Sequence, residues 1–107
     1  MSHGSQRPGR VILLQNMVGP GEVDDELEQE VKDECSTKYG PVERCVVLEL
    51  RGRGVIAEEA VRIFVEFRHQ SHADQALLGL NSRFFGGRRV KAAYYDEDRF
   101  ARRELSA

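Results

Sequence analysis

The stretch Ala60-Val-Arg-Ile-Phe-Val-Glu-Phe67 decides the fold of this 107-residue chain. Its odd-numbered residues, from Val61 to Phe67, are all apolar, whereas Arg62 and Glu66 between them are charged. This period of two is that of a β-strand with one buried face. We therefore predict a strand over residues 60–67 that buries its odd-numbered side chains in a core.

The segments on either side of this strand extend the pattern. Before it, residues 42–50 are rich in β-branched residues and predict a second strand, followed by a loop at 51–54. After it, Ser71 and Asp74 have the spacing of a helix start, and apolar residues at 73, 76, 77 and 80 mark a helix that ends at Asn81 and Ser82. A turn at 86–87 precedes a further strand over 89–95, and a short terminal helix over 96–105 has Phe100 as its anchor.

The first part of the chain supplies the remaining elements. Residues 10–17 form an apolar run that ends at a turn over 18–21, which predicts a buried strand. Apolar residues from Val23 to Cys35 recur every four positions, so 22–39 is predicted to be an amphipathic helix. Asp24 can cap its start, and Gly40-Pro41 stops it. The order β-α-β-β-α-β predicts an α+β fold of ferredoxin-like type: a four-stranded antiparallel sheet with two helices on one face and a short C-terminal helix.

Length and composition limit the class of protein. The chain suits a single domain, which we place at residues 10–105, after a segment over 1–9 that is flexible or an expression remnant. No apolar run approaches the roughly 20 residues of a membrane span, so no membrane is expected as a partner. The two cysteines are expected to be reduced thiols.

Nothing in the sequence predicts an enzyme, a metal site or a cofactor. His69 and His72 are only a pair, without an evident third ligand, and we expect them to be exposed to solvent. No nucleophile has a supporting base in context, and the glycines do not form a phosphate-binding pattern. The expected function is therefore binding.

Charge is sorted along the chain although the net charge is only −2. Eight of the 18 acidic residues lie between Glu22 and Glu34, whereas the segment from Arg83 to Arg103 holds seven bases and three acids. One acidic and one basic surface are expected.

Two strands carry degraded signatures of the RNA recognition motif. In the third strand Phe64 and Phe67 match its aromatic positions, but Arg62 replaces the first aromatic. In the first strand, over residues 12–17, Leu13 stands at the aromatic position. Bases stack on exposed rings of such sheets, and each stacked base is worth about 1–3 kcal/mol. We expect a preserved fold and a degraded RNA platform, with Phe64 as its only ring.

Two further features need an explanation. Glu26, Glu30 and Glu34 form one line on the first helix, which is either a solvated face or a docking surface for a basic ligand. Phe84 and Phe85 are adjacent in a loop bounded by glycines; either both are buried or one is available on the surface.

Together, the degraded signatures, the acidic first helix and the Arg83-Phe84-Phe85 motif resemble the U2 auxiliary factor homology motif family, a peptide-binding variant of the RNA recognition motif. The resemblance covers roughly residues 10–105. It implies a ligand made of basic residues followed by a tryptophan, which enters a pocket between the two helices and the Arg-x-Phe loop.

The resemblance also implies a role for each site residue. Phe85 would stack on the indole, and Arg83 would cover it and pair with an acid of the first helix, Glu34 being the first choice. The middle residue, Phe84, would support the loop. The remaining peptide-binding residues would be acids that receive the ligand's bases and apolar residues of the pocket wall: Asp24 and Glu30, and Leu27 and Val31.

The implied partners are splicing factors in the nucleus: the large subunit of splicing factor 3b, the large U2 auxiliary factor subunit and splicing factor 1. The implied process is 3′ splice-site choice and alternative splicing, with little or no RNA binding by this domain. One alternative is RNA binding on the sheet through Phe64, Arg62 and Lys91, unless the terminal helix lies over it. Another is a homodimer that pairs the acidic helix with a partner's basic segment.

Overall fold

The computed structural model describes residues 7–106. Its elements follow in the order β1 (Val11–Gln15), α1 (Leu27–Lys38), β2 (Val42–Glu49), α2 (Ala57–Ala60), β3 (Val61–Phe67), α3 (Gln70–Leu80), β4 (Phe84–Phe85), β5 (Arg88–Arg89), β6 (Lys91–Tyr94) and α4 (Glu97–Ala101). Of the N-terminal segment expected over residues 1–9, residues 1–6 lie outside this description.

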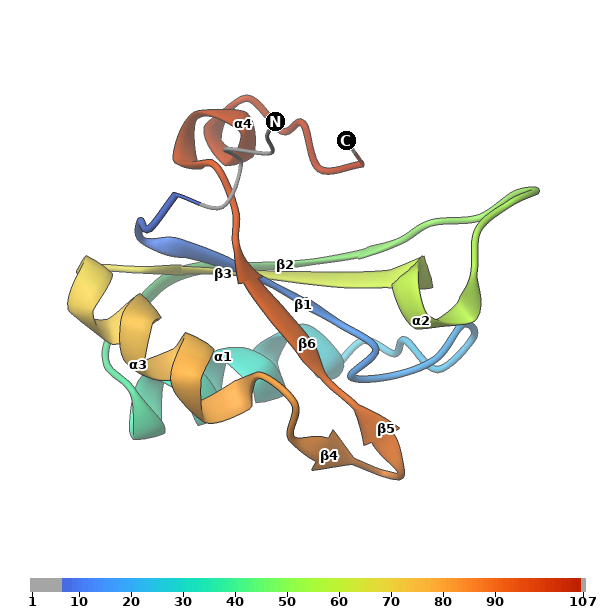
Figure 1. The fold of residues 1–107 in the computed structure, drawn as a ribbon, viewed down its shortest axis with the longest axis horizontal. Coiled ribbons are helices and arrows are strands. Elements are labelled where there is room, and N and C mark those ends of the chain that lie inside the picture. The colour runs from blue at the N-terminus through green and yellow to red at the C-terminus, as the bar shows by residue number, and fades with distance from the viewer. Residues whose placement is uncertain (1–6, 107) are drawn as a thin grey trace.

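The predicted fold class is confirmed. Four antiparallel strands form one sheet in the order β2-β3-β1-β6. Helices α1 and α3 cover one face of the sheet, α4 lies over the other, and the β4–β5 hairpin projects beyond the sheet at the start of β6 (Figure 1).

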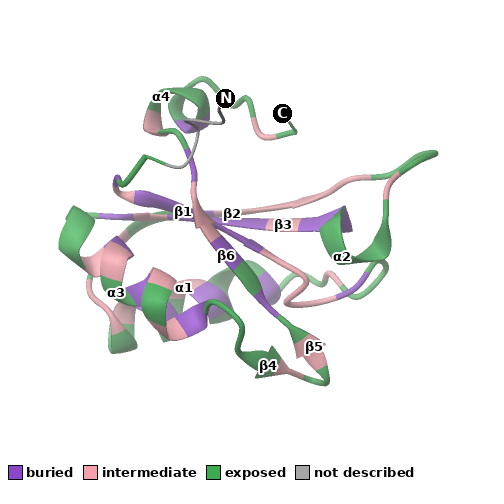
Figure 2. Ribbon diagram, in the orientation of Figure 1, coloured by how far each residue is buried: buried purple, intermediate pink, exposed green. Residues whose placement is uncertain are grey.

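The main core lies between the sheet and the helices α1 and α3. The odd-numbered residues of β3 belong to it, and Ile63 and Phe67 are fully buried. Most of β3 is coloured as buried (Figure 2). Helix α1 contributes Leu27, Val31 and Cys35, as its period of four predicts. The alternation in the sequence therefore identified this core correctly.

Helix α1 is shorter than predicted. It begins at Leu27 rather than at residue 22, because the acidic side chains before it close turns instead. Glu22 accepts a hydrogen bond from the amide of Gly19 at 2.6 Å. Asp24 Oδ1 accepts from the amides of Glu26 and Leu27, each at 3.0 Å, and so still satisfies free N–H groups at the helix start.

The side-chain cap predicted at the start of the second helix is not formed. Helix α3 begins at Gln70, and no side chain caps it. Ser71 lies inside the helix, and Asp74 instead accepts a hydrogen bond from the hydroxyl of Tyr94 at 2.6 Å. The Asp74 carboxylate, which the sequence pattern assigned to the helix cap, is used for this bond to β6.

The short helix α2 and the β4–β5 hairpin were not predicted. Residues 57–60, at the end of the loop, form the single turn α2. The strand expected over 89–95 is divided into β5 and β6 at Val90, whose amide donates to the carbonyl of Arg83 at 2.7 Å. This bond folds the chain back on itself, and so Phe84 and Phe85 pair with β5.

A second apolar cluster lies on the other face of the sheet. Phe100 of α4 is 2% exposed, and its ring centroid lies 6.0 Å from that of Phe64. Tyr95 meets the same Phe64 ring edge-on at 4.9 Å. The terminal helix thus lies over the sheet, and Phe64, expected to be an open ring, is fully buried.

Helix α4 is held at both of its ends. Arg10 donates from its amide at 2.7 Å and from Nε at 3.1 Å to the carboxylate of Glu97. Beyond the helix, the hydroxyl of Tyr95 donates to the carbonyl of Glu104, and Arg62 Nη1 donates to that of Leu105. These contacts hold α4 against the sheet.

Within residues 7–106, no helix is long and apolar enough to cross a membrane.

Candidate functional site

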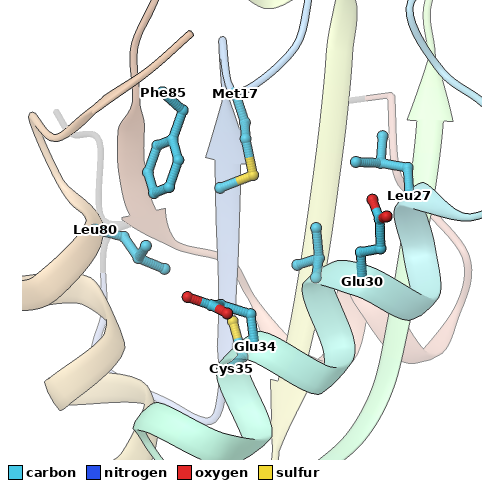
Figure 3. A pocket seen from close by; sticks show the side chains of 8 residues that line it. Met17, Leu27, Glu30, Glu34, Cys35, Leu80 and Phe85 are labelled. Atoms are coloured by element: carbon cyan, nitrogen blue, oxygen red, sulfur yellow. The ribbon is translucent and has the colours of Figure 1, made fainter.

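A surface cavity of about 240 Å³ opens between α1, the end of α3 and the β4–β5 hairpin. Its lining side chains face a common space (Figure 3). Six of the eight are apolar and two are acidic: Met17, Leu27, Val31, Cys35, Leu80 and Phe85, with Glu30 and Glu34.

Helix α1 supplies one wall of the cavity and part of its rim. Leu27, Val31 and Cys35 lie one turn apart and are buried against the core. Glu30 and Glu34 stand beside them on the solvent side and are exposed. One helix therefore presents an apolar stripe and an acidic edge to the same space.

The opposite wall comes from Phe85 of the hairpin. Phe84 and Phe85 are consecutive residues of a strand, so their side chains point to opposite faces. Phe85 packs against the core cluster and lines the cavity, whereas Phe84 is 66% exposed. The expectation that Phe84 supports the loop is therefore not met: its ring faces solvent.

The hairpin is fixed to the loop after β1. Arg88 Nη1 donates to Asn16 Oδ1, and Asn16 Nδ2 donates to the carbonyl of Arg89, both at 3.0 Å. Gly86 and Gly87 adopt positive φ angles of 56° and 83°, which a two-residue hairpin turn requires. Phe85 is thus positioned before any ligand arrives.

Arg83 lies over the Phe85 ring, with its guanidinium carbon 5.4 Å from the ring centroid. Among the described residues Arg83 and Glu34 form no ion pair, and the pair implied around a bound tryptophan stays a prediction. Glu34 pairs instead with Lys38 at 2.6 Å, because the two residues lie one helical turn apart. Arg83 is exposed and remains next to the cavity.

Asp24 lies outside the cavity lining. It is exposed at the start of α1, and one of its oxygens is occupied by the capping bonds. Its negative charge adds to the acidic edge of the helix.

The thiol in the cavity wall is not a reactive group. Burial raises the pKa of Cys35 to about 11, and the charge of Glu34 adds to this shift. Burial likewise raises the pKa of Cys45 to about 12. Both thiols are neutral near pH 7 and serve as small apolar groups.

No cluster that could hold a metal ion occurs among residues 7–106. His69 is exposed as predicted, but His72 is half-buried, and the two rings meet edge-on with centroids 5.3 Å apart.

The residues of the alternative RNA surface do not form an aromatic platform. Phe64 is buried under α4, and Arg62 is half-buried and bonded to the carbonyl of Leu105. Lys91 is exposed at the start of β6. Among the described residues, the cavity beside α1 is therefore the better-formed site.

Three lining residues were not predicted: Met17, Cys35 and Leu80. Cys35 and Leu80 were assigned to helix faces in the core, and Met17 to the end of a strand. Each reaches the cavity at the edge of the core, where helix ends and a strand end meet.

A family model described as "RNA recognition motif" matches residues 25–91. Among solved structures, the RNA recognition motif of RNA15 has a TM-score of 0.65 at 23% identity, covering 89% of this chain and 99% of that one. The third such domain of Mip6 has a TM-score of 0.61 at 22% identity, covering 86% and 96%. These structures share the fold.

Three longer proteins are similar in sequence. DNA-damage-repair/toleration protein 111 of Arabidopsis thaliana is 52% identical over 92% of this chain, which spans 25% of that protein. Splicing factor 45 of Homo sapiens is 53% identical over 87% of this chain and 22% of its own length. Poly(U)-binding-splicing factor PUF60-B of Danio rerio is 46% identical over 95% and 20%. None of these names is that of an enzyme.

Proposed function

Since this chain belongs to the RNA recognition motif family, we propose which of its surfaces binds a ligand: the cavity beside α1, and not the sheet. The ligand is a short linear motif of basic residues followed by a tryptophan, in a disordered segment of another protein. The chain is thus a protein–protein interaction module of the U2 auxiliary factor homology motif type.

The cavity itself is the observation that carries this proposal. An engineered cavity of about 150 Å³ lined by aliphatic and aromatic side chains accepts a benzene ring. A cavity of about 240 Å³ with a mostly apolar lining has room for a larger, two-ring indole. In our proposal the indole stacks on Phe85, and Leu27 and Val31 form the wall behind it.

Charge explains the basic part of the motif. Glu30 and Glu34 lie at the rim, and Asp24 extends the acidic edge of α1. Exposed charges of one sign steer an oppositely charged ligand and fix its register more than they add affinity. In the bound state Arg83, already over the Phe85 ring, covers the indole from the solvent side.

The covered sheet supports the same assignment. Phe64, the ring expected to be open on this face, is packed between Tyr95 and Phe100 and is fully buried. Stacking a base on it would first require α4 to leave.

The names of two relatives indicate the cellular process, which is splicing. Splicing factor 45 and the PUF60 protein are splicing factors by name. We therefore propose a role in 3′ splice-site choice and alternative splicing in the nucleus. The proposed partners are the large subunit of splicing factor 3b, the large U2 auxiliary factor subunit and splicing factor 1.

A tryptophan titration tests the proposal, since the chain contains no tryptophan. The chain is added to a short Lys/Arg-rich peptide with one tryptophan, and the peptide's emission is followed. We expect a saturable blue shift, because the indole moves from water into an apolar cavity. Phe85→Ala should weaken binding by at least about 2 kcal/mol, or roughly 30-fold, as for a central aromatic anchor.

The matched control is Phe84→Ala, one residue away on the other face of the hairpin. It should leave peptide affinity unchanged. Equal loss in both variants, no blue shift, or full displacement of the peptide by single-stranded RNA would overturn the proposal.

A further inference from the structure

The loop between β2 and α2 repeats an arginine–glycine pair that plays no part in the cavity. Its sequence is Arg51-Gly52-Arg53-Gly54, and all four residues are exposed to solvent. The loop projects beyond the end of the sheet (Figure 1), and its tip is coloured as exposed (Figure 2). Two arginines are therefore displayed on a protrusion that another protein can reach.

Arg53 is the less restrained of these two arginines. Arg51 lies 3.5 Å from one carboxylate oxygen of Glu49, whose other oxygen accepts a hydrogen bond from the amide of Gly21 at 2.9 Å. Within residues 7–106, Arg53 forms no ion pair, and neither its amide nor its carbonyl has a backbone hydrogen-bond partner. Arg53 can therefore enter a site on another molecule without breaking contacts of these kinds.

Glycines flank Arg53 on both sides. Gly52 and Gly54 have positive φ angles of 121° and 83°, which a turn without side chains adopts most easily. Internal packing does not require glycine here, because a Cβ atom added at either position would meet nothing within 4 Å. The backbone on each side of Arg53 is thus bare and open to close approach by a second molecule.

We propose that Arg53 is a site of arginine methylation. In this reaction a guanidinium nitrogen attacks the methyl group of S-adenosylmethionine. A C–N bond forms, the C–S bond of the sulfonium donor breaks, and the donor leaves as a neutral thioether. The attacking nitrogen gives one proton to a carboxylate of the transferring enzyme, so the arginine keeps its positive charge.

The shape of the loop suits this transfer. The attacking nitrogen must be aligned with the breaking C–S bond while the enzyme holds both reactants in place. The arginine reaches such an enclosed site only if the backbone that carries it lies against the enzyme surface. Side chains on either side would hold the backbone away, and Gly52 and Gly54 have none.

Methylation would change what the loop can bind. A methylated guanidinium keeps its charge but loses N–H donors, so it no longer forms bidentate hydrogen bonds with a carboxylate. A partner that pairs with the planar end of Arg53 would be released, whereas general attraction between charges would persist. The loop does not line the cavity beside α1, so this inference does not rest on the proposed function.

Incubation of the chain with a type I arginine methyltransferase and S-adenosylmethionine, followed by peptide mass spectrometry, tests the proposal. We expect mono- and dimethylated Arg53. Arg53→Lys should abolish methylation of the loop, whereas the matched control Arg51→Lys should retain it. Arg68 is an internal control: it is also exposed, but it lacks flanking glycines and pairs with Glu43 at 2.9 Å, and it should stay unmodified.

Three results would overturn the proposal. One is no transfer to Arg53 when the same enzyme methylates a glycine-flanked arginine in a short peptide. A second is methylation of the loop that persists in Arg53→Lys. The third is equal methylation of Arg53 and Arg68, because exposure alone would then select the site. Both lysine variants should give the circular dichroism spectrum of the unchanged chain, since the loop is outside the core.

Discussion

Replacing Phe100 by alanine tests how firmly α4 closes the sheet. The side chain is 2% exposed, its ring lies 6.0 Å from that of Phe64, and the Arg44 guanidinium lies 5.7 Å from its centroid. Removal of a buried phenylalanine costs about 3–5 kcal/mol, which combines the lost transfer free energy with the cavity left behind. Because α4 lies at the surface and can relax, we expect the lower end, about 3 kcal/mol.

Urea unfolding followed by circular dichroism measures this loss. For a domain of this size, 1 kcal/mol shifts the melting temperature by roughly 4–8 °C, so the variant should melt about 12–24 °C lower. Phe84→Ala is the control, since its ring is 66% exposed and its removal should change the free energy of unfolding by less than about 0.5 kcal/mol.

The result that would refute the reasoning is a small loss. If Phe100→Ala costs less than about 1 kcal/mol with an unchanged urea dependence, the helix does not pack on Phe64 as the structure has it. A dye that binds apolar surface gives a second readout. It should bind the folded variant more strongly, because Phe64 and Tyr95 become accessible.

Acidic, thiol and phenol groups give three further tests. Asp24→Asn keeps the capping oxygen and removes the charge. It should weaken binding of the basic peptide and reduce the salt dependence of that binding, while the melting temperature stays nearly unchanged. Titrations at several salt concentrations test this, and an unchanged affinity with an unchanged salt slope would contradict it. Burial raises the pKa of Cys35 to about 11 and of Cys45 to about 12, so the unfolded chain loses these protons first. The free energy of unfolding should therefore fall as pH rises above about 9, by up to about 1.4 kcal/mol per pH unit for each thiol, and Cys45→Ala should reduce the slope; a flat urea-unfolding profile would be inconsistent with two buried thiols. The hydrogen bond to Asp74 raises the pKa of Tyr94 to about 12, and Asp74→Asn should lower it, as ultraviolet titration of tyrosinate measures; an unchanged value would mean that the bond is absent in solution.

The fold could be predicted because burial repeats along the chain with the period of each element. Ile63 and Phe67 were assigned to the core by alternation alone, and Leu27 and Val31 by helical spacing. The burial of Phe64 could not be found this way. Alternation puts it on the outer face of the sheet, where Tyr95 and the distant Phe100 cover it.

The site residues that lie on a single helix could be predicted from the sequence. Those brought together from several elements could not. Leu27, Val31 and their acidic neighbours lie on α1, and the cavity includes them. The pair of Arg83 with an acid of α1 stays a prediction for the bound state, since Glu34 pairs with Lys38, one turn away on the same helix. The spacing of Glu34 and Lys38 can be read from the sequence, whereas the position of Arg83 over the Phe85 ring depends on how the hairpin folds.

The back-to-back placement of Phe84 and Phe85 constrains the length of their loop as strictly as its composition. Insertion of a single residue that shifts the pairing of β4 with β5 by one position would exchange the two rings between the cavity and the solvent. Insertion of two residues would restore the original orientation. Evolution or a protein engineer can thus vary many side chains of this hairpin, whereas its pairing can shift only by an even number of residues.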